Sequence, residues 1–157
     1  MMAACVATLV LTACNTVLCP LNNTVYGTYG FYANLDGTES SVSIQDTLTI
    51  KAAGTDSILI NRVANAREVE LPFSFTAGVD TLIFEFVNEA QQLRTDTIWI
   101  TKDNLPHYES PECPAAMFHY VTNVRSTHIL IDSVYVVNPN INYNASENFK
   151  IYFRTAN

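Results

Sequence analysis

Apolar and polar residues alternate with a period of two in several segments of the chain. In residues 68–75 and 149–154, every second residue is apolar, and most of the residues between them are polar or charged. This pattern is typical of an antiparallel strand that covers a core with one face. The apolar runs 58–60 and 82–84 are continuous, so we expect those strands to be more deeply buried. Pro72 cannot donate to a ladder, so its strand is predicted to be an edge strand or to carry a bulge.

Turn signals separate these segments, and no segment shows a sustained helical period. Short strands with short loops indicate a sandwich or a barrel. We therefore predict an all-β fold, an antiparallel sandwich of about eight to nine strands that is immunoglobulin-like or related, with a barrel as the alternative. Residues 88–94 predict one helical turn or the tip of a long hairpin. The turn signals are Leu35-Asp36-Gly37, Ala53-Gly54-Thr55, Ala77-Gly78 and Asn138-Pro139-Asn140.

A triplet of Asp, a hydroxyl residue and an aliphatic residue recurs along the chain. An aspartate suits the turn before a strand, because its carboxylate accepts hydrogen bonds from nearby backbone amides. Calcium ligands are the alternative, but calcium loops gather several oxygens within one short turn, and these aspartates are isolated. We expect them to open strands. The triplets begin at Asp46, Asp56, Asp80, Asp96 and Asp132.

The N-terminal residues are apolar and small, and they end in Leu11-Thr12-Ala13-Cys14. This segment resembles the bacterial lipobox, in which the cysteine takes a diacylglycerol and becomes the new N-terminus. The apolar run is shorter than the roughly 20 residues that a membrane-spanning helix needs. The resemblance implies that Cys14 is lipidated. The alternative is a short hydrophobic strand at the start of a cytosolic protein.

The lipobox divides the chain into a signal peptide at 1–13, a lipidated tether at 14–24 and a single β domain at 25–157. One feature departs from the lipobox pattern. Signal peptides carry Lys or Arg in their first residues, and here the first basic residue is Lys51.

The chain has four cysteines, and the lipobox accounts for two of them. Cys5 leaves with the signal peptide, and Cys14 carries lipid. Cys19 and Cys113 remain, and an exported protein meets an oxidising compartment, so we predict a disulfide between them. Such a bridge stabilises by up to roughly 4–5 kcal/mol in the chain-entropy model. The alternatives are two buried free thiols and, with less support because neither lies in a Cys-x-x-Cys motif, a metal site.

Tyrosines and glycines crowd the first predicted strand, residues 25–33. Tyr26, Tyr29 and Tyr32 suit the aromatic core and cross-strand pairs of a sheet. The alternative is an aromatic platform that binds a ligand such as a sugar ring.

Two imidazoles and two carboxylates lie within a short segment, at His107, Glu109, Glu112 and His119. Zinc takes such ligands, but the spacing matches no established motif, and the prolines of the loop oppose a helix that would bring them together. The alternative is a rigid loop in which these side chains make local hydrogen bonds, and we favour it. We predict no metal and no other cofactor.

The composition excludes several classes of function. The net charge is −7, and the eight basic residues are scattered singly, which excludes a nucleic-acid footprint and electrostatic docking on anionic lipid. The chain has no Gly-x-Ser-x-Gly elbow and no glycine-rich phosphate loop. We therefore expect no enzymatic activity.

Several segments together resemble a family of small lipoproteins from Bacteroidota that carry a domain of unknown function. The resemblance implies membrane anchoring and a β-rich fold, and it implies no activity. Residues 15–18 lack the acidic residues typical of surface export in that phylum, which favours a periplasm-facing place at the outer membrane. The segments are Cys14, Cys19-Pro20-Leu21-Asn22-Asn23-Thr24, the Asp triplets, residues 106–114, Ile141-Asn142-Tyr143 and Glu147-Asn148-Phe149-Lys150.

These observations give three hypotheses of function. The first is a non-enzymatic, lipid-anchored binding or assembly module at the outer membrane, with the membrane and another envelope protein as partners. The second is a glycan-binding module that uses the three tyrosines of residues 25–33. The third is a metal-dependent hydrolase built on the loop 107–119.

Overall fold

The computed structural model describes residues 18–20, 23–144 and 146–154. This part of the chain forms eleven β-strands and no helix, which confirms the predicted all-β class. The strands are β1 (Tyr26–Leu35), β2 (Thr38–Ser41), β3 (Thr47–Ala52), β4 (Ile58–Val63), β5 (Glu68–Pro72), β6 (Val79–Val87), β7 (Leu93–His107), β8 (Ala116–Ser126), β9 (Ile131–Val136), β10 (Asn140–Ile141) and β11 (Glu147–Phe153). The short strands β2 and β10 raise the count above the prediction.

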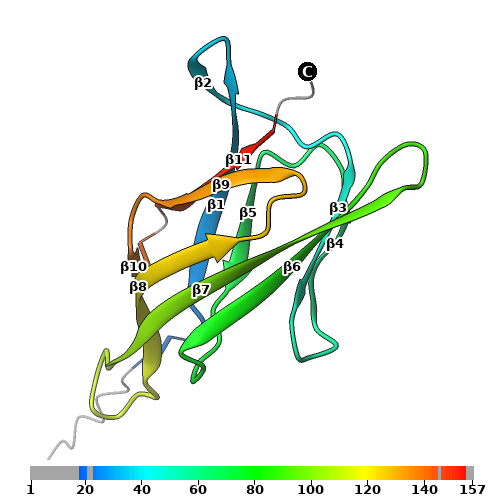
Figure 1. Cartoon of the computed structure of the whole chain (residues 1–157). Helices are drawn as coiled ribbons and strands as arrows, with labels where there is room; N and C mark the ends of the chain where they lie inside the picture. The colour runs from blue at the N-terminus through cyan, green and yellow to red at the C-terminus, as the bar shows by residue number, and fades with distance from the viewer. Residues whose placement is uncertain (1–17, 21–22, 145, 155–157) are drawn as a thin grey trace, which may run out of the picture.

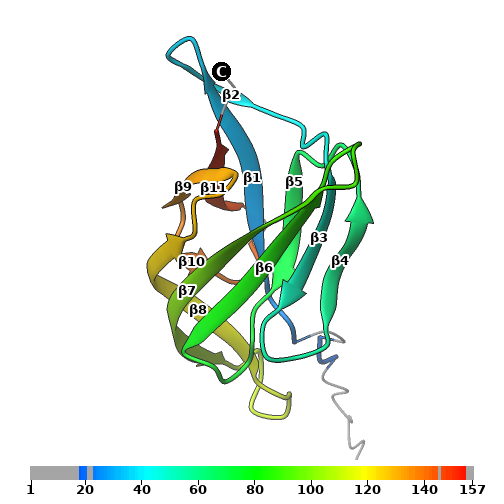
Figure 2. The ribbon, with the colours of Figure 1, turned by 45° about the vertical axis from the view of Figure 1, so that its right-hand side comes forward.

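The strands form two sheets that pack face to face (Figure 1). The five-stranded sheet has the order β2-β1-β11-β9, and β5 also pairs with β1. The six-stranded sheet has the order β10-β8-β7-β6-β3-β4 (Figure 2). Every strand pair is antiparallel except β1 with β11, which is parallel. The first and last strands therefore lie side by side in the centre of one sheet.

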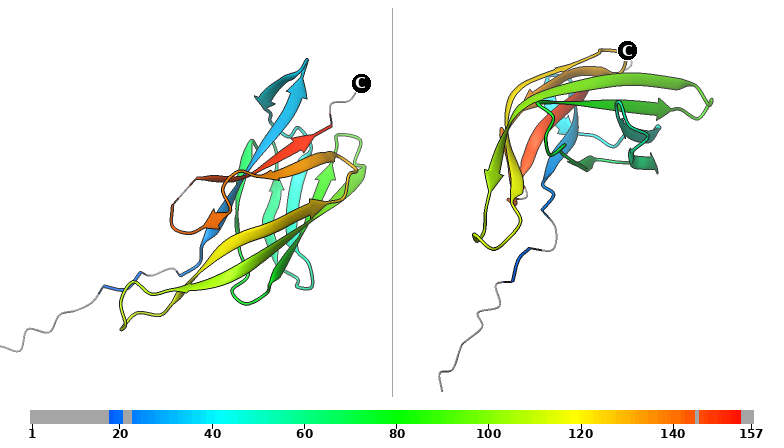
Figure 3. Two further views of the ribbon diagram at one scale, coloured as in Figure 1. Left: turned by 60° about the vertical axis from the view of Figure 1, so that its left-hand side comes forward. Right: turned by 90° about the horizontal axis from the view of Figure 1, so that it is seen from below.

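The six-stranded sheet is strongly curved. Seen from below, β7 and β8 bend across the other sheet instead of lying flat on it (Figure 3). β7 is the longest strand, with 15 residues, and it pairs with β6 along its first half and with β8 along its second half. The predicted sandwich is therefore confirmed, with one sheet that wraps part of the way around the core.

The core is built from the inward-facing residues of both sheets. In β5 and β11 the predicted alternation holds, with Val69, Leu71 and Ile151 buried. Tyr29 stacks on Phe149 with 4.5 Å between the ring centroids. Each large apolar side chain that is buried in this way stabilises the fold by roughly 1.5–3 kcal/mol.

Strand β4 contradicts the expectation for the continuous run 58–60. β4 is the outermost strand of its sheet, and Ile58 is 52% exposed. Continuous apolar character therefore does not mean burial on both faces here. The expectation for Pro72 is confirmed, since β5 pairs with β1 and has no other partner strand among the described residues. Residues 88–92 form the tip of the β6–β7 hairpin, as one of the two alternatives predicted.

The aspartate prediction holds at some triplets and fails at Asp96. Asp46 comes directly before β3. Asp96 instead lies inside β7 and is fully buried, where its carboxylate accepts hydrogen bonds from Thr127 Oγ1 and from the amides of residues 129–131. Burial raises the pKa of Asp96, but these hydrogen bonds outweigh burial, so its pKa lies below the usual value. Asp96 therefore holds the turn between β8 and β9.

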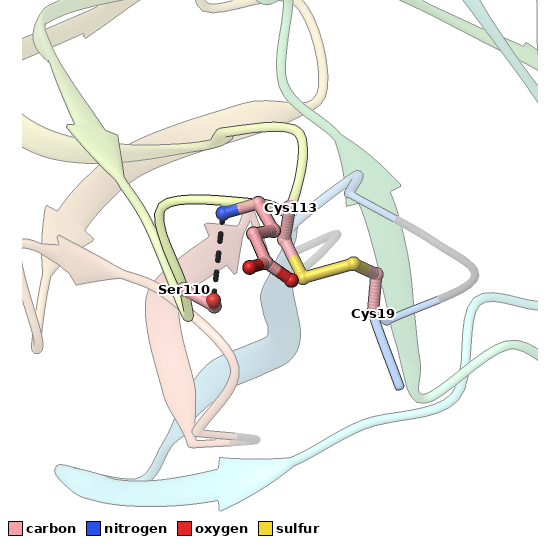
Figure 4. Close-up of a disulfide and its surroundings, with 4 residues drawn as sticks. Cys19, Ser110 and Cys113 are labelled. Atoms are coloured by element: carbon pink, nitrogen blue, oxygen red, sulfur yellow. Dashed lines mark hydrogen bonds between the residues drawn. A yellow bond between two sulfur atoms is a disulfide. The ribbon is translucent and has the colours of Figure 1, made fainter. Parts of the chain in front are cut away.

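The predicted disulfide is present. Cys19 is bonded to Cys113 with 5.4 Å between the Cα atoms, and the bridge joins residues 94 positions apart in the chain (Figure 4). The amide of Cys113 also donates to the carbonyl of Ser110 at 3.1 Å (Figure 4). The bridge ties the segment before β1 to the turn between β7 and β8. The predicted signal peptide 1–13 and the predicted lipidation site Cys14 lie outside the described residues.

Within the described residues, no helix offers a stretch that could cross a membrane.

Candidate functional site

The outward face of the five-stranded sheet carries a cluster of tyrosines and charged residues from four strands. β2 contributes a glutamate, β1 and β9 one tyrosine each, and β11 the other three residues. The register sets these side chains beside one another, because Tyr32 lies opposite Tyr152 and Tyr135 lies opposite Lys150. We call the cluster the tyrosine face; it consists of Glu39, Tyr32, Tyr135, Glu147, Lys150 and Tyr152.

The three rings form a continuous row across β1, β11 and β9. The centroids of Tyr32 and Tyr152 are 5.8 Å apart, with a tilt of 35° between the planes. Tyr135 meets Tyr152 almost at a right angle, at 5.5 Å and 88°. Tyr135 is 59% exposed, so it is the most accessible ring of the row. Aromatic pairs at these distances and angles are favourable.

Hydrogen bonds and ion pairs fix the row in place. Tyr32 Oη donates to Glu147 Oε1 at 2.7 Å, and the Tyr152 hydroxyl donates to Glu39. Lys150 pairs with the same Glu39, and its Nζ lies 4.6 Å from the centroid of Tyr32. Tyr32 and Tyr152 are therefore held at their hydroxyl ends, and Tyr135 packs against the held ring of Tyr152.

The carboxylates also shift the titration of their partners. The hydrogen bond to Glu39 raises the pKa of Tyr152 to about 12, and the bond to Glu147 raises the pKa of Tyr32. The hydrogen bond that Lys150 donates to Glu39 lowers the pKa of Glu39 and raises the pKa of Lys150. Tyr32 and Tyr152 therefore stay neutral, and Glu39 and Lys150 stay charged, across the physiological pH range.

Gly30 makes the contact between Glu147 and Tyr32 possible. A Cβ at this position would lie 1.9 Å from Glu147 Oε1 and 2.8 Å from Tyr32 Cε2. Any other residue here would displace the Glu147 carboxylate. The sheet therefore leaves one surface position empty so that a side chain from β11 can cross over β1.

The charge of this surface is negative. On β5, Val69 and Leu71 point into the core, so Glu68 and Glu70 lie on the outward face beside β1. Together with the tyrosine face, the surface carries four glutamates and Lys150, a net charge of −3.

A second charged cluster lies in the interior, between the sheets. The Lys102 side chain is 0% exposed, and its Nζ donates to the carbonyls of Ser74 and Ala77 at 2.8 and 2.7 Å and to Asn104 Oδ1 at 2.7 Å. Asp80 Oδ2 lies 3.7 Å from the same nitrogen, and Asp80 accepts a bond from the Ser74 amide at 3.2 Å. We call Lys102, Asp80, Asn104 and His119 the lysine cluster.

His119 completes the lysine cluster as a neutral imidazole. Its Nδ1 lies 2.8 Å from Asn104 Oδ1 and 3.4 Å from Lys102 Nζ, and its ring stacks on Phe73 at 5.4 Å. Burial, with the nearby Lys102 charge, lowers the pKa of His119 to about 4. Burial also lowers the pKa of Lys102, and Asp80 opposes that shift.

The lysine cluster has no free donor to offer a ligand. All three protons of the Lys102 ammonium have acceptors, and two of the acceptors are carbonyls of the loop between β5 and β6. Asn104 Nδ2 donates to carbonyls of the same loop, at Thr76 and Ala77. The cluster therefore fixes this loop to β7 and β8, and we interpret it as structural.

The predicted tyrosine platform of residues 25–33 is corrected by the structure. Tyr29 is 1% exposed and stacks on Phe149 inside the core, so it cannot contact a ligand. Tyr26, at 44% exposure, and Tyr32 lie on the outward face, six residues apart along β1. Tyr32 belongs to the tyrosine face, but its ring partners come from β11 and β9.

The predicted metal candidates do not converge. His107 and Glu109 are 3.1 Å apart at the protein surface, where His107 also stacks on Phe118. His119 is 2% exposed and points to the other side of the sheet, into the lysine cluster. Glu112 donates its amide to Ser110 in the turn. The described residues contain no group of three or more His, Cys, Asp or Glu side chains that could hold a metal ion.

Sequence reasoning did not find either cluster. The tyrosine face depends on the parallel pairing of β1 with β11, which joins Tyr32 to Tyr152 across the whole domain. No local pattern carries that information. The burial of Lys102 could have been predicted, because it continues the row of Asp96, Ile98 and Ile100 at a spacing of two.

The comparisons with known proteins add a family and no activity. A family model described as "Family of unknown function (DUF6452)" matches residues 47–153, which cover β3 to β11 and the whole lysine cluster. On the tyrosine face, Tyr32 and Glu39 lie before the matched segment. No curated protein and no solved structure matches the chain.

Proposed function

The chain belongs to this family of unknown function, DUF6452, and on that premise we propose that it is a non-enzymatic binding module of the cell envelope. Its tyrosine face recognises a cationic segment of another envelope protein. The observation that carries the proposal is the network on the outward face of the sheet, in which hydrogen bonds hold Tyr32 and Tyr152 and the exposed ring of Tyr135 packs against Tyr152.

Rigid aromatic rings suit recognition. Tyr is enriched in protein interfaces because it offers a large contact area and loses little conformational entropy on binding. A ring that is already fixed loses less entropy still, which leaves more of the contact energy for affinity. Tyr135 offers the accessible face, and Tyr152 supports it from the side.

The charges select the partner. Glu39 and Glu147 contact the rings, and Glu68 and Glu70 lie on the same face of the sheet, along β5. A segment that carries Lys or Arg is therefore attracted, and an acidic segment is repelled. Lys150 already shows the contact that an incoming cation would make, since it lies over Tyr32 and pairs with Glu39. A partner cation over Tyr135 repeats this geometry at the open end of the row.

The disulfide supports a place outside the cytoplasm. Bridges of this kind persist in oxidising compartments and are rare in the cytosol, and Cys19–Cys113 is formed. In this proposal Cys14 carries the lipid anchor, as in the Bacteroidota lipoproteins that the sequence resembles, and faces the periplasm from the outer membrane. The five residue spacings from Cys14 to Cys19 reach at most about 18 Å, so the disulfide end of the domain is kept close to the bilayer.

The binding proposal is tested by photo-crosslinking in the native envelope. A benzoylphenylalanine replaces Tyr135 in one variant and Tyr120 in the control, because Tyr120 is 43% exposed on the other sheet. We expect one discrete protein adduct from position 135 and none from position 120. Adducts of equal yield from both positions, or none from either, contradict the proposal.

The anchor is tested separately by the intact mass of the protein purified from its native membrane. We expect an acylated chain that begins at Cys14, and a gain of two hydrogens when the disulfide is reduced. A chain that retains residues 1–13 without lipid contradicts the anchor and leaves the crosslinking result standing.

A glycan is the second candidate ligand. The nearly perpendicular rings of Tyr135 and Tyr152 form a corner in which a sugar ring can stack on one face, while Glu39 accepts from its hydroxyls. A glycan array distinguishes the glycan from the cationic segment. Saturable binding that Tyr135→Ala abolishes favours the glycan, and an array without binding favours the cationic segment.

A further inference from the structure

A cavity of about 290 Å³ lies between the two sheets. The end of β1 and the β6–β7 hairpin, which line it, lie at the end of the sandwich away from the β7–β8 turn that carries Cys113 (Figure 1). It is bounded by the end of β1, the segment between β2 and β3, the β6–β7 hairpin, the β8–β9 turn and the end of β11. The tyrosine face lies on the outer side of the same five-stranded sheet, so the cavity is a separate site.

The floor of the cavity is aromatic and aliphatic. Phe86 is 1% exposed and Ala33 is 5% exposed. The ring of Phe153 meets Phe86 edge to face at 5.7 Å. Leu35, at the mouth, is 47% exposed. The cavity therefore offers an apolar surface that an apolar chain could cover.

The rim of the cavity is cationic, which is unusual in a protein with a net charge of −7. Its charged residues are Arg94, Arg154 and Asp46, which sum to +1. Arg94 Nη2 pairs with Asp46 Oδ2 at 2.7 Å, so the Asp46 charge is already balanced. Arg154 forms no salt bridge with any described residue, so it provides a positive charge without an acidic partner there.

Arg94 also carries an unpaired donor. Its Nε is buried and is the one buried side-chain nitrogen or oxygen in the described part of the chain that lacks a hydrogen-bond partner. A buried donor without an acceptor destabilises the folded state. An acceptor placed in this cavity, with a small shift of the guanidinium, would relieve that cost.

We propose that this cavity, which we call the arginine pocket, binds a small amphipathic carboxylate such as a short fatty acid. The apolar chain covers Phe86 and Phe153, and the carboxylate pairs with Arg94 and Arg154. Guanidinium groups favour carboxylates because their N–H donors match the two oxygens. The volume lies near the lower end of ligand pockets, so the ligand is small.

A second cavity provides an internal comparison. It has about 370 Å³, lies near the start of β6, and is lined by Phe73, Leu82 and Val79 with the Asp80 carboxylate. The two cavities are similarly apolar, but this one presents a carboxylate in place of the arginines. A ligand selected by its anionic group therefore enters the arginine pocket and avoids the second cavity.

The test is an NMR titration of the full folded domain with hexanoate, hexan-1-ol and hexylamine. We expect saturable shifts at residues of the arginine pocket, with hexanoate binding about tenfold tighter than hexan-1-ol and hexylamine weaker still. Shifts centred on Asp80, or equal affinity for hexanoate and hexan-1-ol, overturn the proposal, and so does the absence of any saturable shift.

Two variants check the arginines. Arg94→Gln should weaken hexanoate about tenfold and leave hexan-1-ol unchanged. Arg154→Gln should weaken hexanoate binding several-fold. The Arg154 side chain is exposed, so this variant should fold as the wild type does. Arg125→Gln is the matched control, because Arg125 lies over Trp99 away from the pocket. Unchanged hexanoate affinity in both pocket variants also overturns the proposal.

Discussion

Two lysines of this protein make the same kinds of contact in opposite surroundings. Lys102 has an acid 3.7 Å away and an aromatic ring centroid at 6.0 Å, and its side chain is 0% exposed. Lys150 pairs with Glu39, lies 4.6 Å from the Tyr32 centroid, and is 24% exposed. In the interior, two backbone carbonyls and Asn104 Oδ1 accept the three protons of Lys102. On the surface, the ring faces and carboxylates around Lys150 stay open to solvent.

The difference separates a structural cluster from the surface that we propose as a recognition site. A buried ammonium ion destabilises the fold unless it is fully paired, so the acceptors around Lys102 must keep their positions. Surface ion pairs contribute little to stability. Stabilisation of the fold therefore explains the ordered network of the tyrosine face less well than binding of a partner does.

The largest expected effect separates the two lysines directly. Lys102→Met removes one partner of a buried pair and leaves Asp80 and the carbonyls of Ser74 and Ala77 without their donor. We expect the free energy of unfolding in urea to fall by about 3–5 kcal/mol. Lys150→Met is the matched control and should leave the urea midpoint close to that of the wild type. Equal losses in the two variants contradict the comparison.

Acidification should weaken the interior selectively. In the unfolded chain, His119 takes up a proton near the ordinary histidine pKa of 6.5, but in the folded protein it stays neutral until about pH 4. The unfolded state binds more protons in that window, so stability is full above pH 6.5 and falls by roughly 3 kcal/mol as the pH drops to 4. The polar and charged groups against the ring are Asn104 and Lys102, and Asp80 lies beside Lys102.

Urea unfolding of the wild type and of His119→Gln at several pH values measures this contribution. The difference between the two curves removes the carboxylates that titrate near pH 4. His107→Gln is the control, because His107 is partly exposed and lies on the other side of the sheet. If His119→Gln keeps the whole pH slope of the wild type, His119 is not the neutral buried group described above.

Gly30→Ala sharpens the comparison on the surface side. The new Cβ displaces the Glu147 carboxylate, so Tyr32 loses the hydrogen bond that raises its pKa. We expect the pKa of Tyr32 to return toward 10, measured by NMR of the ring, with a change in unfolding free energy below about 1 kcal/mol. An unchanged Tyr32 titration would show that the network does not depend on the empty position.

The smallest effect on stability is expected for Glu39→Gln. The substitution replaces the carboxylate whose hydrogen bond, together with burial and its charge, raises the pKa of Tyr152 to about 12, so that pKa should fall toward 10. The urea midpoint should not change measurably, because Glu39 is exposed. A marked loss of stability would make the tyrosine face structural and remove its contrast with the lysine cluster.

Local patterns in the sequence predicted the fold class and the disulfide. Alternation and turn signals gave the strands, and the cysteine count gave Cys19 and Cys113. The same alternation could have shown that Tyr26 and Tyr29 point to opposite faces, because they lie three positions apart, an odd number, in one strand. It could also have shown that Lys102 continues an inward row.

What escaped prediction depends on long-range pairing. The parallel pairing of β1 with β11 joins the first and last strands of the domain, and no turn or repeat in the sequence predicts it. The edge position of β4, which exposes Ile58, is equally a property of strand order. The tyrosine face and the arginine pocket both form where distant segments meet, so neither could be read from spacing alone.

The central claim is that the tyrosine face binds a cationic partner and contributes little to stability. The most direct measurement is the crosslink yield from benzoylphenylalanine at position 135 in the native envelope, with Glu39 and Glu147 intact or replaced together by Gln. The account predicts that the double variant keeps the urea midpoint of the wild type and loses the adduct. An adduct that persists at full yield would contradict the claim.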